Sequence, residues 1–115
     1  METRELAKIV YKALDDKKGI DIKAIDISEI SPIADYFIIA SASNPNQLSA
    51  MQDEVDRMMY ENGRQAKSVE GNNKSTWILM DYEDIIVHLF SEEDRAFYNL
   101  ERIWQDGIII SGDEL

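Results

Sequence analysis

Three carboxylates that could do chemistry stand between two short apolar segments of the sequence, at Asp81, Glu83 and Asp84. Together they could hold Mg²⁺ beside a nucleotide phosphate, because Mg²⁺ prefers oxygen ligands. Aspartate is also common in tight turns for reasons of backbone geometry alone. The group therefore has two interpretations, a metal site and a turn.

A Mg²⁺-dependent nucleotide-binding or nucleotidyltransferase-like enzyme is the hypothesis that would use these carboxylates. The small residues Ser41-Ala42-Ser43 follow an apolar run and precede a helical pattern, as the phosphate-binding turn of such an enzyme would. That turn contains a glycine, however, and is followed by an aspartate pair on the next strand. Here the glycine is missing, and Asp53 and Asp56 fall on the helix. We therefore predict no catalytic residues.

His88 is the single histidine, and the chain has no cysteine. A metal site at His88 would need carboxylates for all its other ligands, and a catalytic dyad would need a nucleophile. Ser91 is close in sequence, but we expect its hydroxyl to cap a helix. His88 is expected to face a polar neighbour on the surface of a sheet, and we predict neither a metal nor a cofactor.

Trp77 indicates a different kind of site. Strand alternation puts Trp77, Leu79 and Asp81 on one side of their segment. On the next segment it separates Ile86, His88 and Phe90 from Ile85, Val87 and Leu89. We expect the sides with Asp81 and His88 to meet water, which would expose a patch rich in aromatic residues. Tryptophan is enriched in binding hot spots, so the patch is either a protein-binding surface or, if a helix covers Trp77, part of the core.

The formal charge of −11 on 115 residues limits the partners. An acidic protein repels phosphate backbones, so we expect little direct nucleic-acid contact. A basic protein partner is the electrostatic complement, although the charge could serve solubility alone. No apolar run approaches the roughly 20 residues that cross a membrane, and residues 1–10 are too charged for a signal peptide. A cytoplasmic location is expected.

The elements that must position these residues follow the order α-β-β-α-β-β-β-α. Apolar spacing predicts helices over residues 6–14, 45–61 and 92–106, with Asn44 and Ser91 as the N-caps of the last two. Predicted strands are Ile20–Ile27, Tyr36–Ala40, Ala66–Glu70, Trp77–Asp81 and Ile85–Phe90. This order indicates a single α/β domain with a mixed five-stranded sheet and flanking helices, which we expect on one face.

Two features near the C-terminus belong to this prediction. Helical spacing predicts that Phe97, Leu100, Ile103 and Trp104 are buried. Ile108-Ile109-Ile110 is apolar and is either a docked tail or an exposed segment.

Several short strings, in this order, resemble the ribosomal silencing factor family (RsfS, also called Iojap). They are Asp35–Ser41, Val69-Glu70-Gly71, Trp77 with Asp81–Asp84, Val87-His88, and Arg95–Glu101 with Trp104. The resemblance spans about residues 3 to 106. It implies one domain over residues 1–106, of a nucleotidyltransferase-like α/β fold without a catalytic site, and leaves residues 107–115 as a C-terminal tail.

The resemblance also implies a function. Members bind the large ribosomal subunit, chiefly through its protein L-fourteen, and sterically block joining of the small subunit, which represses translation. When free they tend to form homodimers. The implied partner-binding surface comprises Glu70, Trp77, Leu79, Asp81, Tyr82, Asp84, His88 and Tyr98.

Overall fold

The computed structural model describes residues 2–71, 76–110 and 115. The helices are α1 (Thr3–Asp16), α2 (Pro45–Glu61), α3 (Glu92–Tyr98) and a 3₁₀ turn, η1 (Leu100–Trp104). The strands are β1 (Ile20–Asp26), β2 (Tyr36–Ala42), β3 (Ser68–Glu70), β4 (Trp77–Asp81), β5 (Ile85–Ser91) and β6 (Ile108–Ile110). No helix in the described ranges is long and apolar enough to cross a membrane.

The sheet has the strand order β3-β4-β5-β2-β1-β6 and is mixed, as predicted. Only β2 and β5 run parallel, and the other neighbours are antiparallel. Strand β2 is buried along its whole length, which explains its unbroken apolar sequence. The sequence prediction of five strands is wrong by one, because β6 pairs with the outer edge of β1.

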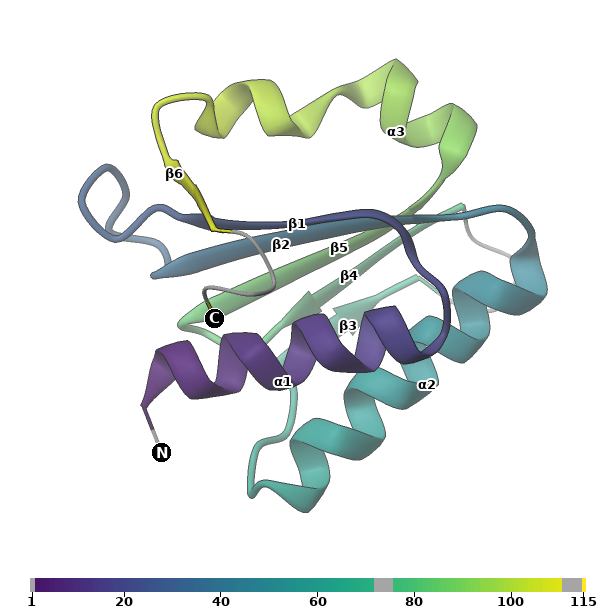
Figure 1. Cartoon of the computed structure of the whole chain (residues 1–115), viewed down its shortest axis with the longest axis horizontal. Helices are drawn as coiled ribbons and strands as arrows, with labels where there is room; N and C mark the ends of the chain where they lie inside the picture. Colours follow the sequence, from purple (N-terminus) through teal and green to yellow (C-terminus); the bar gives the residue numbers. More distant parts are fainter. Residues whose placement is uncertain (1, 72–75, 111–114) are drawn as a thin grey trace.

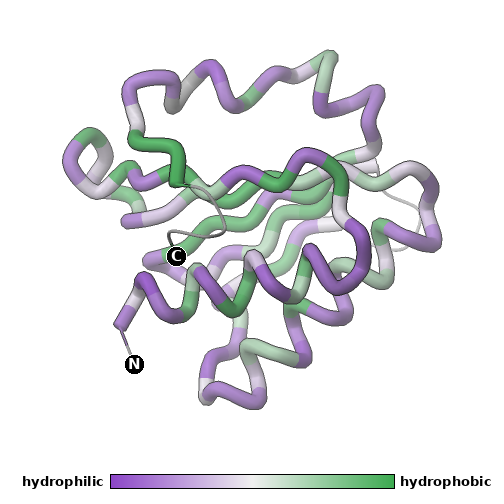
Figure 2. Tube along the Cα trace, viewed as in Figure 1, coloured by the Kyte–Doolittle hydropathy of each residue, from purple (hydrophilic) through white to green (hydrophobic). Residues whose placement is uncertain are grey.

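Helices α1 and α2 pack side by side on one face of the sheet (Figure 1). The core lies between them and the strands, where hydrophobic residues concentrate (Figure 2). Helix α2 begins as predicted: the Asn44 side chain accepts a 2.8 Å hydrogen bond from the Gln47 backbone N–H. The Gln47 amide oxygen in turn accepts from the Ser43 backbone N–H at 2.7 Å.

The expectation that all helices lie on one face is wrong. Residues 92–110, which we call the strap, leave the end of β5, cross the opposite face and return as β6 (Figure 1). The strap is not one helix, because Asn99 adopts a left-handed conformation at φ 47° and ends α3. Ser91 caps α3 as predicted, accepting a hydrogen bond from the Asp94 backbone N–H at 3.1 Å.

The helix break also changes which strap residues are buried. Phe97, predicted to be buried, is 81% exposed, whereas Leu100 is partly buried as expected of an apolar contact. The side chains of Ile103 and Trp104 lie outside the described residues. In β6, Ile110 enters the core while Ile108 and Ile109 stay exposed, so the apolar tail is docked as a strand through one of its three isoleucines.

Candidate partner-binding face

The face of the sheet beneath the strap brings together most of the residues singled out in the sequence. Cross-strand pairing places Trp77 opposite Phe90, Leu79 opposite His88 and Asp81 opposite Ile86. On the outer side of β4, Glu70 pairs with Leu79. On β4 the alternation predicted from the sequence is confirmed, because Ile78 and Met80 point the other way and are fully buried. On β5 the expectation that the side with His88 meets water is wrong, because His88 and Phe90 are both buried.

A groove of about 410 Å³ opens on this face where the strap does not cover β4 and β5. Its lining is mostly apolar, with one carboxylate and one imidazole; the lining residues are Ile27, Ile33, Phe37, Trp77, Leu79, Asp81, Ile86, His88 and Leu100. Two further hollows adjoin it: one shares Trp77 and Leu79 and reaches Glu70, and the other reaches Lys67 and Glu83. The open surface therefore runs across β4 as an apolar groove with acidic ends.

Trp77 is neither a free surface side chain nor a core residue, because it is half-buried in a cluster of rings. Its ring centroid lies 5.1 Å from those of Phe90 and Tyr98. Its indole N–H donates a 2.9 Å hydrogen bond to Nδ1 of His88. One part of the indole is thus held in place while another lines the groove, which is the geometry of a pre-organised binding anchor.

His88 is the polar partner that fixes this indole. Its side chain is buried, against the expectation of a surface position, and packs against Phe37 with ring centroids 4.7 Å apart and planes tilted by 33°. Burial lowers the pKa of His88 to about 4, from an ordinary value of 6.5. An indole N–H can only donate, so Nδ1 must be unprotonated, and His88 is neutral at pH 7 with its proton on Nε2.

Acid should destabilise the protein through His88. Its pKa is lower in the folded state, so between pH 6.5 and 4 the unfolded chain binds more protons, and stability falls as the pH drops. The loss should approach about 3 kcal/mol near pH 4. Urea titrations across this range would measure it. The His88→Asn variant, whose amide oxygen can accept the indole N–H, should show a flatter profile, and an equally steep one would contradict the assignment.

The carboxylate of Asp81, at the acidic end of the groove, both forms a turn and lines the open surface. The Asp81 carboxylate accepts the Glu83 backbone N–H at 2.8 Å, so it shapes the turn. Asp81 also lines the groove, and Glu83 is exposed beside it. Among the described residues, no group of three or more acidic or histidine side chains could hold a metal ion.

The structure places Tyr82 and Asp84, two members of the set implied by the resemblance, away from the groove. Tyr82 is 1% exposed in the core beneath α1 and α2, and its hydroxyl has no hydrogen-bond partner among the described residues. Asp84 turns toward the helical layer, where its carboxylate pairs with Arg64 at 2.7 Å and accepts from the Thr3 hydroxyl at 3.1 Å. The pKa of Asp84 is lowered although its partial burial acts to raise it, because Arg64 and Thr3 stabilise the charged form. Both residues hold the turn between β4 and β5 in place.

Four groove residues were not anticipated: Ile27, Ile33, Phe37 and Leu100. Ile33 is 68% exposed on the loop between β1 and β2, and the Ser31-Pro32 break gave no sign that this loop reaches the groove. Leu100 comes from η1, whose position depends on the left-handed Asn99. These residues meet only through long-range packing, and the local sequence carries no signal for it.

Gly71 keeps the β3–β4 pair closed. Its φ is +106°, and a Cβ at this position would lie 2.8 Å from the Trp77 carbonyl oxygen. We expect Gly71→Ala to lower the free energy of unfolding by about 3 kcal/mol, from backbone strain and the clash. Gly63 is the matched control, since its φ is +80° but its Cβ would meet open space. Gly63→Ala should lower the free energy of unfolding by about 1 kcal/mol. If urea denaturation gave equal losses for Gly63→Ala and Gly71→Ala, the clash at Gly71 would be refuted.

The chain is a small α/β domain with an open apolar groove on one face of its sheet. A family model described as "Ribosomal silencing factor during starvation" matches residues 1–114. The ribosomal silencing factor RsfS of Bacillus subtilis is 40% identical over 106 residues, covering 92% of this chain and 90% of that protein. The chloroplastic protein Iojap of Zea mays is 30% identical, covering 90% of this chain and 45% of that protein.

Solved structures agree with these sequence matches. A crystal structure of a Chromobacterium violaceum protein superimposes with a TM-score of 0.87 at 31% identity, covering 91% of this chain and 88% of that one. A Bacillus halodurans protein gives 0.83 at 32% identity, with coverage of 95% and 99%. The chain belongs to the ribosomal silencing factor family, which makes it a ribosome-associated regulator of translation.

Proposed function

We propose that this protein binds the large ribosomal subunit through its protein L-fourteen and sterically blocks joining of the small subunit, thereby repressing translation. Family membership supports a ribosomal partner. The observation that supports a binding role is the groove itself, where an indole fixed by His88 lines the same groove as Asp81 and adjoins a hollow that reaches Glu70. Such a surface suits a basic protein with an apolar side chain that enters the groove.

Steric blocking requires only that the protein occupy the large subunit, and it involves no catalytic turnover. In the proposed mechanism the protein contributes a rigid face and its own bulk, and translation falls in proportion to the large subunits that it covers. Because the charge is −11, association should be fast at low salt and should slow as salt screens the attraction. We place this activity in the cytoplasm, where subunits join.

Sedimentation with purified ribosomal particles tests the proposal. The protein should co-sediment with isolated large subunits but not with joined ribosomes, and should lower the yield of joined ribosomes when small subunits are added afterwards. It should also bind isolated protein L-fourteen. Equal binding to joined ribosomes and large subunits would rule out the steric mechanism.

A Mg²⁺-dependent nucleotide enzyme is the alternative, and the geometry around β2 and β5 disfavours it. Ligands of α/β folds often bind beyond the carboxyl ends of parallel strands. The hollow at that place is lined by Glu92, Glu93 and Asp94, which would repel a phosphate. Ser41, of the candidate phosphate turn, is buried and accepts a hydrogen bond from Arg95 Nη1 at 3.0 Å. Calorimetry with nucleoside triphosphates and Mg²⁺ should show no binding at millimolar ligand.

Self-association through the same face is part of the proposal. A homodimer of the free protein would cover the groove and would be released when the subunit binds. Sedimentation velocity should then show a dimer that Leu79→Asp converts to monomer. A dimer unaffected by this substitution would place self-association elsewhere on the molecule.

A further inference from the structure

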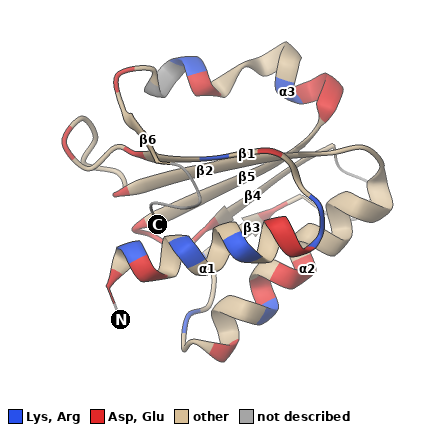
Figure 3. Ribbon diagram, in the orientation of Figure 1, with Lys and Arg blue, Asp and Glu red and all other residues tan. Residues whose placement is uncertain are grey.

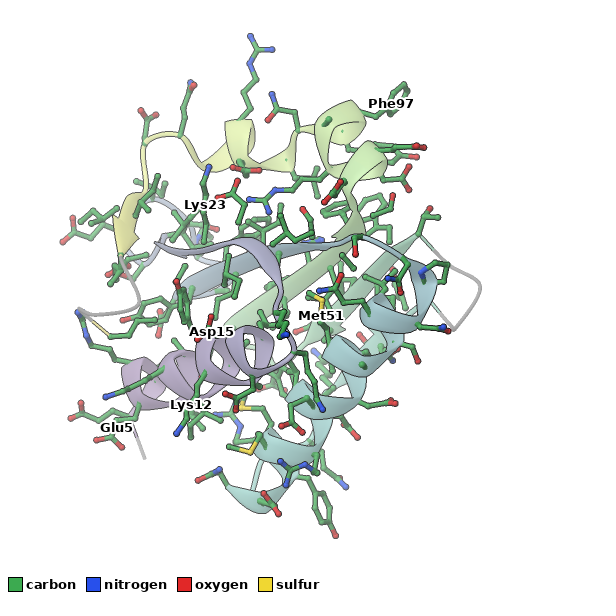
Figure 4. The ribbon with its side chains drawn as sticks, turned by 45° about the vertical axis from the view of Figure 1, so that its right-hand side comes forward. Glu5, Lys12, Asp15, Lys23, Met51 and Phe97 are labelled. Atoms are coloured by element: carbon green, nitrogen blue, oxygen red, sulfur yellow. The ribbon has the colours of Figure 1, made fainter. Side chains whose placement is uncertain are left out.

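Phe97 is the most exposed large hydrophobic side chain among the described residues. It is 81% exposed on α3 and points away from the body of the protein (Figure 4). Its ring makes a T-shaped contact with Tyr98, with centroids 5.1 Å apart and planes at 86°. An aromatic side chain left in water in this way contributes little to folding, so a role in binding explains it better.

The exposure of Phe97 follows from how α3 is anchored. The buried residue of α3 is Arg95, which fixes the inner side of the helix against the sheet. Phe97 is two positions further along, so it falls on the opposite, outer side. The next residue, Tyr98, packs back against Trp77. The strap therefore cannot bury Phe97 without releasing Arg95.

Phe97 is continuous with the groove through a chain of ring contacts. Tyr98 contacts both Phe97 and Trp77, with centroids 5.1 Å apart in each pair, and is itself 48% exposed. Trp77 lines the groove. A partner seated on Trp77 thus meets an uninterrupted aromatic surface that extends from the sheet over the strap to Phe97.

The charge around Phe97 indicates what this surface can bind. The first turn of α3 is acidic, with Glu92, Glu93 and Asp94 in succession (Figure 3). Glu93 precedes Phe97 by four residues and is exposed on the same side of the helix. Asp94 is occupied by a hydrogen bond from the Thr76 hydroxyl. An aromatic face beside a carboxylate is a favourable place for an arginine guanidinium or a lysine ammonium.

We propose that Phe97 and Glu93 form a second contact point for the basic protein partner that occupies the groove, with an arginine or lysine of that partner stacked on the Phe97 ring. The proposal rests on the proposed function for its partner and extends the surface beyond the groove. The net charge of −11 favours a basic occupant over a second copy of this acidic chain. The two contact points together orient the partner, which a single groove would leave free to rotate.

Binding of the full-length Phe97→Ala and Glu93→Gln variants to purified large ribosomal subunits tests this assignment. Loss of a cation–π contact should weaken binding by Phe97→Ala about 3- to 30-fold. Glu93→Gln should weaken binding less and reduce its dependence on salt. Both variants should unfold at the same urea concentration as the original protein, because neither side chain is buried.

The controls are matched in chemistry and exposure. Tyr60, a 64% exposed aromatic residue on α2, is the control for Phe97. Glu5, an exposed glutamate on α1, is the control for Glu93. Tyr60→Ala and Glu5→Gln should leave binding unchanged. If the original protein binds large subunits and Phe97→Ala binds equally well, the second contact is wrong while the proposed function stands. If Phe97→Ala only weakens self-association of the free protein, the surface belongs to a second copy and the proposal fails.

Discussion

Replacing Trp77 by alanine is expected to weaken binding to large ribosomal subunits by about 30- to 1,000-fold, the range of a binding hot spot. The substitution removes the indole that lines the groove and, with it, the support for Tyr98. It also leaves His88 Nδ1 without its donor. Competition with a labelled protein for purified subunits would measure the change.

A second variant and a stability measurement distinguish the loss of a binding contact from a loss of folded protein. Trp77→Phe keeps a ring but loses the indole N–H, so its affinity should lie between that of the original protein and that of Trp77→Ala. Urea denaturation establishes how much of each variant is folded, and affinities are compared for the folded fraction. A folded Trp77→Ala protein with unchanged affinity would show that the partner does not use this face.

Replacing Arg95 by alanine should have the largest effect on the fold, a loss of about 3 to 5 kcal/mol in the free energy of unfolding. The guanidinium is buried and pairs with the Glu101 carboxylate at 2.8 Å. It also donates to the Ile20 and Asp21 carbonyls at 3.1 and 2.6 Å and to the Ser41 hydroxyl. Without Arg95, these acceptors lose their donor and α3 loses its polar contacts with β1 and β2.

Arg102 provides the matched control, because it is an exposed arginine on the same strap. Arg102→Ala should stay within about 0.5 kcal/mol of the original protein. Arg95→Lys keeps one charge and should give an intermediate loss, which keeps the comparison measurable if Arg95→Ala fails to fold. The assignment would be contradicted if Arg95→Ala and Arg102→Ala were equally stable in urea.

Loss of the Arg95 contacts should also weaken binding at the proposed partner-binding face. Glu101 bridges Arg95 and Lys23, and both partners lower its pKa although partial burial acts to raise it. Leu100, next to Glu101, forms one wall of the groove, and Tyr98 supports Trp77. The same contacts therefore hold the strap on the sheet and shape the groove, so stability and binding are coupled at Arg95.

The elements that the sequence predicted well are those whose signals are local. Asn44, Pro45 and Gln47 start α2 as expected, since capping depends on residues three or four positions apart. The alternation in Trp77–Asp81 and the continuous apolar run of β2 gave the correct faces and the correct central strand. The prediction of one continuous last helix is wrong because Asn99 adopts a left-handed conformation, which the apolar spacing does not signal, and so divides the strap.

The binding face was only partly predictable. Trp77, Leu79, Asp81 and His88 lie together on adjacent strands as expected. Tyr82 and Asp84 resemble the family's surface residues in sequence, but their side chains face the helical layer, since the turn after β4 reverses the chain. No local pattern could reveal that Arg64 and Thr3, from distant parts of the chain, would engage Asp84.

Periodicity and short motifs encode the fold class, the central strand, the family and the two sides of β4 directly, so these could be predicted from the residues alone. Three features could not be predicted in this way: the strap crosses the second face, β6 extends the sheet, and Trp77 is half-buried against His88 and Tyr98. These outcomes depend on contacts between residues far apart in the chain, above all those of Arg95 with Ile20, Asp21 and Ser41. Such contacts form only when several elements have already packed, which is why the groove and the exposed Phe97 have no signature in the sequence.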